Sequence, residues 1–454
     1  MSRFSPKAPL PQRLLLTVLL CAVVLTYLES SSFDSNLDST SQRFLRSHHH
    51  SELETGDADA TKITTSHPNF LAFLPYLSLT ASAFAVFLSL AIICDDFLCP
   101  AIDIICDVFS LSDDIAGATL LAFGSSAPEI FMNLSATAKG QVNMSLPAVL
   151  GSAIIAFGFI PPACAYAVAK PMKLEAWPVM RDSVSYVFAL GCFYTFLDEG
   201  NIDTKESGIL VAIYFVYLLL IFVPHFMSSG KVAYEEIGEK EEAEAAQEEG
   251  EDEEGSGCIG MFFSVCSKPI HFVFSWTVPV QPEESTNPSA PLAFFSVFMS
   301  LVWVTILSSL ALEVADNATT VCRMKHSTAG ATLLAAGAQI PDLFGSLSMA
   351  KGGMPGGAIS NAVGSQVINV SLGVGAPFLA YNLLMGQPIN AGSGSEAMRH
   401  MAVLLMVVIL VFWIVVLPMS SWCMGKRGET KLGKGGATVL MGVAIACYWL
   451  SVGK

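Results

Sequence analysis

The feature that most constrains the fold of this chain is a series of ten apolar stretches, each near the length needed to cross a membrane. A bilayer offers no water to exposed backbone groups, so a chain crosses it only as helices or as a closed barrel. A run of about 20 apolar residues is typical of the helical alternative. We therefore expect an all-α membrane protein with ten core transmembrane helices. The stretches lie near residues 70–94, 115–138, 146–168, 177–197, 207–227, 290–313, 328–350, 358–384, 398–418 and 433–453.

Composition and charge agree with this expectation. Hydrophobic residues make up 53% of the 454 residues and charged residues 14%, whereas soluble globular proteins carry about 25% charged residues. Much of the net charge of −16 comes from residues 231–255, which hold twelve Asp and Glu against two Lys. No Lys/Arg cluster is dense enough to neutralise a phosphate backbone, which argues against a nucleic-acid partner.

The N-terminus has the pattern of a targeting segment. Basic residues precede an apolar run over residues 14–28, which predicts a signal peptide or a signal anchor within residues 1–29. Both alternatives place residues 30–69 on the non-cytoplasmic side of the membrane. That segment is rich in Ser, Thr and Asp, so we expect it to be disordered.

The remaining chain divides into two halves of similar layout. Residues 70–227 and 290–454 each contain five of the apolar stretches, which predicts two five-helix repeats. Residues 228–289 between them form an acidic loop, whose apolar part near 258–280 we expect to lie at the membrane interface. Basic residues in the short loop at the start of the fourth stretch, Arg181 among them, and in the loop before the tenth place this loop in the cytoplasm by the positive-inside rule.

A duplicated motif lies in the second and third stretches of each half. Residues 117–129 (GATLLAFGSSAPE) and 330–342 (GATLLAAGAQIPD) share eight of thirteen positions at an offset of 213. The same offset aligns a Gly-Ser pair at 151–152 with one at 364–365. Because each half has an odd number of expected spans, the two halves would enter the membrane from opposite sides. Inverted duplications of this kind are typical of secondary transporters.

Each copy of the motif places an acid near the middle of an expected span, Glu129 in the first and Asp342 in the second. A charged side chain at that depth costs roughly 2.5–3.5 kcal/mol, so the acids should face each other, a cavity or a cation. Each acid follows a proline, which cannot donate a backbone hydrogen bond. We therefore expect both helices to be interrupted just before the acid and to line a cavity with freed carbonyl oxygens.

Hydroxyl residues near the acids favour a site for a hard cation. Ser125 and Ser126 precede Glu129 by about one helical turn, and Ser152 and Ser365 follow glycines in the partner helices. Calcium binds about six to eight oxygen ligands, some of them from carboxylates. Two carboxylates would offset its charge, while carbonyls and hydroxyls complete the shell and could also hold sodium.

These motifs resemble those of the cation/calcium exchanger superfamily, in particular its sodium/calcium exchanger branch. Residues 124–129 (GSSAPE) look like the first-repeat signature of that branch, and 340–342 (IPD) like the second. Residues 94–97 (CDDF) and 111–119 (LSDDIAGAT) are similar to the potassium-dependent sodium/calcium exchangers. The resemblance implies ten core helices, ions bound at the membrane midplane, and electrogenic exchange of sodium for calcium by alternating access.

The resemblance also implies a set of ion ligands. Glu129 and Asp342 would be the acidic, metal-binding ones. Carbonyl and hydroxyl ligands would fall at Ala122, Ser125, Ser126, Ser152, Ala335 and Ser365. Gln339 stands where the family usually has a small hydroxyl residue, and its amide oxygen could serve as a ligand. Asn369 stands where potassium-dependent members typically carry Asp, so we expect transport without a requirement for potassium.

Other functions stay open at this point. A proton-coupled or potassium-dependent exchanger is the nearest alternative, although Gly-Ser before the first acid is typical of the sodium-coupled branch. The patterns of an intramembrane aspartyl protease are absent around both acids, and proline-interrupted inverted repeats favour a transporter over a channel. We expect no enzymatic activity and no cofactor, only transported Ca²⁺ and Na⁺. The sequence leaves open the membrane, plasma or internal, and the oligomeric state.

Overall fold

The computed structural model describes residues 74–109, 122–168, 171–228, 258–279, 290–390, 395–416 and 429–452. The segments predicted as a signal sequence (1–29) and as a disordered tail (30–69) lie outside the described residues. One compact unit contains Pro75–His271 and Val280–Lys454. A second contains Met1–Leu74 and Phe272–Pro279. The account below concerns the first, larger unit.

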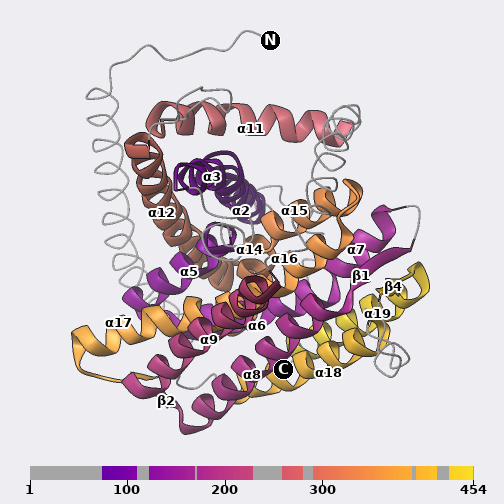
Figure 1. The fold of residues 1–454 in the computed structure, drawn as a ribbon. Coiled ribbons are helices and arrows are strands. Elements are labelled where there is room, and N and C mark those ends of the chain that lie inside the picture. Colours follow the sequence, from indigo (N-terminus) through magenta and orange to yellow (C-terminus); the bar gives the residue numbers. More distant parts are fainter. Residues whose placement is uncertain are drawn as a thin grey trace, which may run out of the picture. The chain divides into compact units, whose positions relative to one another are not determined.

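The described part of the chain is mostly helical (Figure 1). The elements of the first half are α2 Leu74–Ile93, η2 Cys94–Leu98, α3 Cys99–Val108, α5 Ala122–Lys139, α6 Val142–Gly158, α7 Ile160–Ala167, β1 Met172–Glu175, α8 Ala176–Glu199, β2 Asn201–Ile202 and α9 Thr204–Ser228, and α11 Cys258–Thr277 lies between the halves. Here η denotes a π-helical segment. The helix α11 falls in the region expected at the membrane interface and contains Pro269.

The second half repeats this plan. Its elements are α12 Ala290–Cys322, α13 His326–Ala329, η4 Gly330–Leu334, α14 Ala335–Ala338, α15 Ile340–Lys351, α16 Pro355–Ile368, η5 Asn369–Val374, α17 Gly375–Met385, β3 Ile389–Asn390, α18 Ser395–Val416, β4 Glu429–Leu432 and α19 Lys434–Val452. Every predicted span therefore overlaps a helix or a run of consecutive helices.

The predicted boundaries need one large correction. The first span was expected to end near residue 94, but helix continues through η2 and α3 to Val108. The π-helical turn η2 carries Asp95 and Asp96, and the two acids mislead a hydropathy reading without ending the helix. Among the described residues, six helical runs are long and apolar enough to cross a membrane. The count of ten spans therefore stays a prediction.

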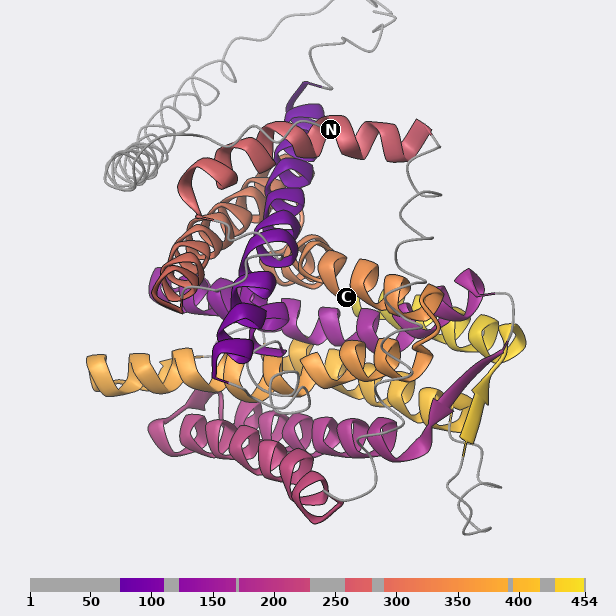
Figure 2. The ribbon, with the colours of Figure 1, turned by 45° about the horizontal axis from the view of Figure 1, so that its top comes forward.

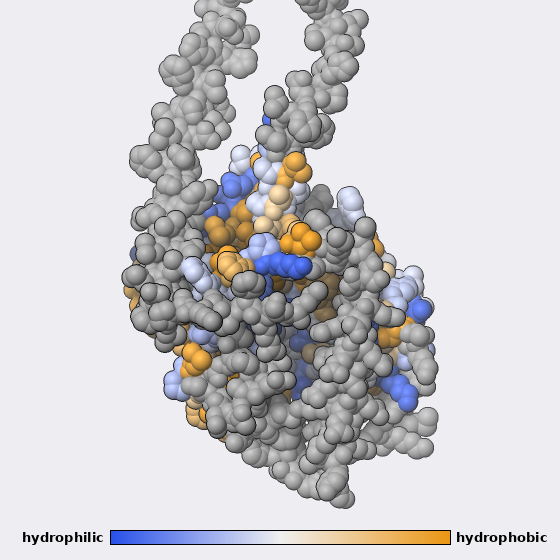
Figure 3. All heavy atoms as spheres, turned by 90° about the horizontal axis from the view of Figure 1, so that it is seen from above, coloured by the Kyte–Doolittle hydropathy of each residue, from blue (hydrophilic) through white to orange (hydrophobic). Residues whose placement is uncertain are grey.

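Burial separates central helices from peripheral ones. In the run that joins α6 and α7, 83% of the most apolar window is buried, against 28% in α9. Large apolar side chains are exposed on the peripheral helices, for example Phe188 on α8, Phe215 on α9 and Trp449 on α19. On the face seen in Figure 3, hydrophobic residues (orange) also stand at the surface beside hydrophilic ones (blue). Exposed apolar surface of this extent fits contact with lipid.

Glycines allow the central helices to cross in close contact. Helix α6 packs against η4 and α14, and at this crossing Gly151 faces the backbone of Ala331. A Cβ added to Gly151 would lie 2.5 Å from the carbonyl oxygen of Ala331. A Cβ added to Gly330 would overlap the carbonyl oxygen of Met144. Both glycines recur in the sequence at the repeat offset, Gly151 with Gly364 and Gly330 with Gly117, and small residues of this kind let helices approach closely.

Two short antiparallel ribbons, which the sequence did not predict, join the halves. Strand β1 pairs with β4, and β2 pairs with β3. Figure 2 shows the magenta strand β1 beside the yellow strand β4. In this ribbon Lys173 lies opposite Lys431, so the two basic loops, which were predicted to share one side of the membrane, are next to each other. Arg181 lies inside α8, where it pairs with Asp182, so its charge does not belong to a loop.

The crossing of α6 with η4 predicts a specific sensitivity to size. Gly151→Ala and Gly330→Ala each place a methyl group against backbone atoms that have no rotamer to change. We expect each variant to lose about 1–3 kcal/mol of stability, measured as a lower thermal midpoint of the purified protein in detergent. Gly191→Ala in α8 is the control, because an added Cβ there meets no atom within 4 Å. Equal thermal midpoints for all three variants would contradict this packing.

Candidate ion-binding site

The two acids reach the centre of the unit on helices that differ in form. In the second repeat the helix is interrupted at Gln339, between α14 and α15, as expected for a proline at 341. In the first repeat α5 runs without a break through Pro128, so the predicted interruption before Glu129 is wrong. The proline removes only one backbone donor, and the bonds on either side hold the helix together. The duplicated motif therefore gives two different helix geometries.

Glu129 and Asp342 converge on one amide group. The Nε2 atom of Gln339 donates hydrogen bonds to Glu129 Oε1 at 3.1 Å and to Asp342 Oδ2 at 3.5 Å. Both acids are buried, with 5% and 3% of their surface exposed. Two carboxylates that bond to the same nitrogen are close enough to bind one cation. The two acids therefore lie close together, as the sequence predicts, and their role in binding an ion stays a prediction.

A chain of polar side chains connects Asp342 to the first repeat. Ser365 Oγ on α16 donates to Asp342 Oδ2 at 2.9 Å, and Gln366 Nε2 donates to Ser365 Oγ at 3.2 Å. Ser152 Oγ on α6 in turn donates to Gln366 Oε1 at 3.3 Å. The two serines that the repeat aligns are thus joined through Gln366. Sequence reasoning missed Gln366, because the first repeat has no polar residue at the equivalent position, Ala153.

A small cavity lies beside Glu129 between α5, α6 and the η4–α14 segment. Its walls hold Glu129, Met132, Asn133, Ser145, Ala148, Val149, Ser152, Leu334, Ala335 and Ala338. Glu129 Oε2 and Ser145 Oγ are buried there without a hydrogen-bond partner in the described part of the chain. Asn133 and Ser145 were not predicted, since they stand outside the duplicated motif and are ordinary polar residues in apolar runs.

The other expected ligands differ in their surroundings. Ser126 Oγ is buried and finds no hydrogen-bond partner among the described residues. Asn369 begins η5, is fully buried and lies close enough to Glu129 for its amide to interact with that carboxylate. Ser125 is half-buried, and it interacts with another residue. Ala122 is the first residue of α5, and its side chain is outside the described set.

Helix α12 holds α5 in place along the length that carries Glu129. Ser308 Oγ donates to the carbonyl oxygen of Pro128 at 3.4 Å, directly before the acid. Further along, Ser309 Oγ donates to Ser135 Oγ at 3.0 Å. A partly exposed ion pair between Lys139 and Glu313 ends this line of contacts at 3.2 Å. The acid therefore sits on a helix that is fixed by a neighbour on one side.

The chemistry of the site is that of hard oxygen ligands around two negative charges. Glu129 Oε2, Gln339 Oε1, Ser126 Oγ and Asn369 Oδ1 are buried oxygens without a partner in the described residues. Buried polar atoms are normally bonded, so the unpartnered oxygens of Glu129 and of Gln339, which bonds to both acids, indicate room for a ligand there. Carboxylate, amide and hydroxyl oxygens are the ligands that calcium prefers. The residues present therefore fit a calcium or sodium ion.

Comparison with known proteins gives similarity over most of the chain. The human sodium/potassium/calcium exchanger 5 is 24% identical over 396 residues, which cover 75% of this chain and 78% of that protein. The rat sodium/potassium/calcium exchanger 3 is 32% identical over 139 residues, 31% of this chain and 22% of that protein. Among solved structures, the sodium-calcium exchanger NCX_Mj matches with a TM-score of 0.44 and 17% identity, over 82% of this chain and 97% of that one.

The sequence pattern of one family also covers both halves. The family described as sodium/calcium exchanger protein matches residues 79–223 and 292–453. The unmatched region between these segments contains the acidic loop, and both buried acids lie inside the matched segments. The family is one of transporters that exchange calcium against another cation, with several helices in the membrane. This chain belongs to the sodium/calcium exchanger family and is an integral, multi-pass membrane protein.

Proposed function

We propose that the chain is a secondary active antiporter that exchanges sodium for calcium, with both ions bound in turn between Glu129 and Asp342. The observation that carries this proposal is the pair of hydrogen bonds from one Gln339 nitrogen to both carboxylates. Two buried negative charges at that spacing repel each other in a medium of low dielectric constant. A divalent cation between them would offset both charges at once.

The side-chain amide of Gln339 can serve the site both with and without a bound cation. Its amide nitrogen bonds to both acids, while its oxygen is buried without a partner in the described residues. The orientation of an amide follows from the hydrogen bonds around it. A cation between the carboxylates favours the opposite orientation, with Gln339 Oε1 as a ligand. The amide group would thus compensate the acids when no cation does so.

The two ribbons support an inverted arrangement of the halves. Strands β1 and β2 lie at opposite ends of α8, and they pair with β4 and β3 respectively. The loop after the third expected span contains β1, and the loop after the eighth span, its equivalent in the second repeat, contains β3. These equivalent loops therefore belong to different ribbons, which lie at opposite ends of α8. This is the relation expected of two oppositely inserted five-helix repeats, 70–227 and 290–454, which open alternately to the two sides.

Sodium is the coupling ion that the ligand set favours. Glu129 and Asp342 are the two buried carboxylates of the described site, and the exposed Asp95 on η2 acts on Asp342 from outside this pair. Asn369 adds an uncharged amide where a third acid would offset an additional cation. We therefore propose exchange that does not require potassium. The names of the similar proteins, sodium/potassium/calcium exchangers, support potassium-dependent exchange as the second candidate. A proton-coupled exchange of cations is the third.

Neutralising either acid should disable transport. Glu129→Gln and Asp342→Asn keep the size of the side chain and remove one of two charges that offset calcium. We expect apparent calcium affinity to fall by more than the roughly 10- to 100-fold typical of losing a supporting residue around a metal. The measurement is sodium-driven uptake of radioactive calcium into proteoliposomes. The control is Asp316→Asn on α12, which changes a partly exposed acid whose ion pair in the described part of the chain is with His326 and not with α5. Near-normal exchange by Glu129→Gln would refute the site.

Removing the Gln339 amide should destabilise the protein most where calcium is lacking. In Gln339→Met the two acids lose a shared donor, and a buried group without its partner costs about 1–3 kcal/mol. We expect the thermal midpoint to fall strongly in a chelator and much less in calcium. Ser348→Ala, which changes an exposed serine on α15, the helix after Gln339, should lower the thermal midpoint in neither condition. An equal loss for Gln339→Met in both conditions would contradict the role given to the amide.

Gradients imposed one at a time separate the candidate coupling ions. In proteoliposomes with a sodium gradient and with organic cations in place of potassium, we expect calcium uptake to continue. The reason is that two carboxylates can offset one calcium ion but no additional potassium. Uptake that appears only when potassium is added would establish the second candidate instead. Uptake that is abolished by collapsing a proton gradient, and is insensitive to sodium, would establish the third.

A further inference from the structure

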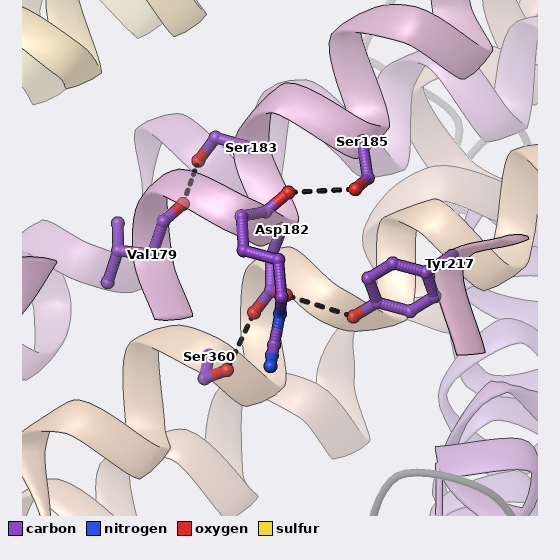
Figure 4. Close-up of polar contacts among 7 residues, drawn as sticks. Val179, Asp182, Ser183, Ser185, Tyr217 and Ser360 are labelled. Atoms are coloured by element: carbon purple, nitrogen blue, oxygen red, sulfur yellow. Dashed lines mark hydrogen bonds and ion pairs between the residues drawn. The ribbon is translucent and has the colours of Figure 1, made fainter. Parts of the chain in front are cut away.

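A buried carboxylate outside the ion site joins helices from both halves of the chain (Figure 4). The side chain of Asp182 on α8 is 1% exposed and pairs with Arg181 Nε at 2.7 Å. Tyr217 Oη on α9 donates to Asp182 Oδ1 at 3.1 Å. Ser360 Oγ on α16 donates to Asp182 Oδ2 at 2.7 Å. One acid therefore connects two helices of the first half to a helix of the second.

The donors around Asp182 leave little room for a cation. Arg181 and Tyr217 occupy Oδ1, and Ser360 occupies Oδ2. The guanidinium of Arg181 already offsets the negative charge, so a metal ion would have to displace it. A buried carboxylate that is both paired and hydrogen-bonded holds its partners firmly, because breaking any contact leaves a charge in an apolar interior. The arrangement is that of a fixed junction between helices.

The junction contacts α16 through Ser360, close to the ion site. Ser360 and Gly364 are one turn apart on the face toward α8 and α9, and a Cβ added to Gly364 would lie 3.2 Å from Tyr217 Oη. The next residue, Ser365, donates to Asp342 Oδ2 at 2.9 Å. Ser360 and Ser365 are only about 7.5 Å apart along a helix with a rise of 1.5 Å per residue. A rigid segment of little more than one turn therefore carries both contacts.

We propose that Asp182 is a positioning residue for the ion site: through Ser360 it sets the height and rotation of α16, and so places the hydroxyl of Ser365 on Asp342. This inference rests on the proposed function, since it assumes that Asp342 binds the ion. Hydrogen bonds weaken steeply once distance and angle leave a narrow range. A small shift of α16 is therefore enough to loosen the bond between Ser365 and Asp342.

The same junction makes α8, α9 and α16 behave as one body. Two of these helices belong to the first half of the chain, while α16 carries ligand candidates of the second half. Any movement that opens the site must therefore take place at other contacts, or must move all three helices together. Asp182 would thus act on the binding step, through the geometry of Asp342, and leave the maximal rate of exchange nearly unchanged.

The test uses Ser360, because removing its hydroxyl loosens the junction and leaves Arg181 to offset the charge of Asp182. We expect Ser360→Ala to raise the calcium concentration for half-maximal exchange about tenfold, with the rate at saturating calcium preserved. Ser360→Thr keeps the hydroxyl and should restore the affinity. The controls are Ser183→Ala and Ser185→Ala on α8 (Figure 4), whose hydroxyls, within the described part of the chain, bond to carbonyls of their own helix, those of Val179 and Arg181. Both should behave as the unmodified protein.

A double-mutant cycle distinguishes positioning from general loss of stability. If Asp182 acts through Ser365, then Ser360→Ala should cause no further loss of calcium affinity in a Ser365→Ala background. Independent, additive losses would overturn the proposal, as would a lower thermal midpoint of Ser360→Ala with unchanged calcium affinity. Calcium affinity is also measured by equilibrium tracer binding to the purified protein. If the protein bound calcium without exchanging it, the proposed function would be refuted. The double-mutant cycle could still be measured as calcium affinity, so the two failures are distinguishable.

Discussion

The structure depends on two buried carboxylates that meet at a single amide group. Glu129 and Asp342 come from different halves of the chain, and Gln339 Nε2 bonds to both. An isolated charge inside a membrane protein is costly, and two like charges are costlier still. The surrounding helices therefore have to supply donors, or a cation, at this one point. This requirement explains why polar residues gather at the centre of a chain that is otherwise apolar.

The rest of the fold serves to bring these residues together and to hold them. Glycines at the crossing of α6 and η4 let the two repeats approach until their backbones touch. The line Ser152, Gln366 and Ser365 then joins the repeats by hydrogen bonds. Farther from the centre, the Asp182 junction fixes α16 against α8 and α9. These contacts lie in the interior between the helices, and together they limit how far the ligands can move.

Features repeated at a fixed offset were predictable from the sequence, whereas contacts between unlike positions were not. The duplicated motif placed Glu129 and Asp342 together because one fold pattern serves both copies. Gln366, Ser145 and Asp182 have no equivalent signal, since their roles depend on which helices become neighbours. The continuous helix through Pro128 was missed because propensity describes one residue, while a helix is held by all its bonds. The short ribbons depend on pairing between loops distant in sequence.

The most direct test of the account is the position of the ion itself. Anomalous diffraction from crystals soaked in strontium, a heavier ion with the chemistry of calcium, would locate it. The account predicts a peak between Glu129 and Asp342, with oxygen atoms of both carboxylates at roughly the 2.3–2.6 Å of calcium coordination. A peak that contacts neither carboxylate, or a site occupied equally in Glu129→Gln, would contradict it.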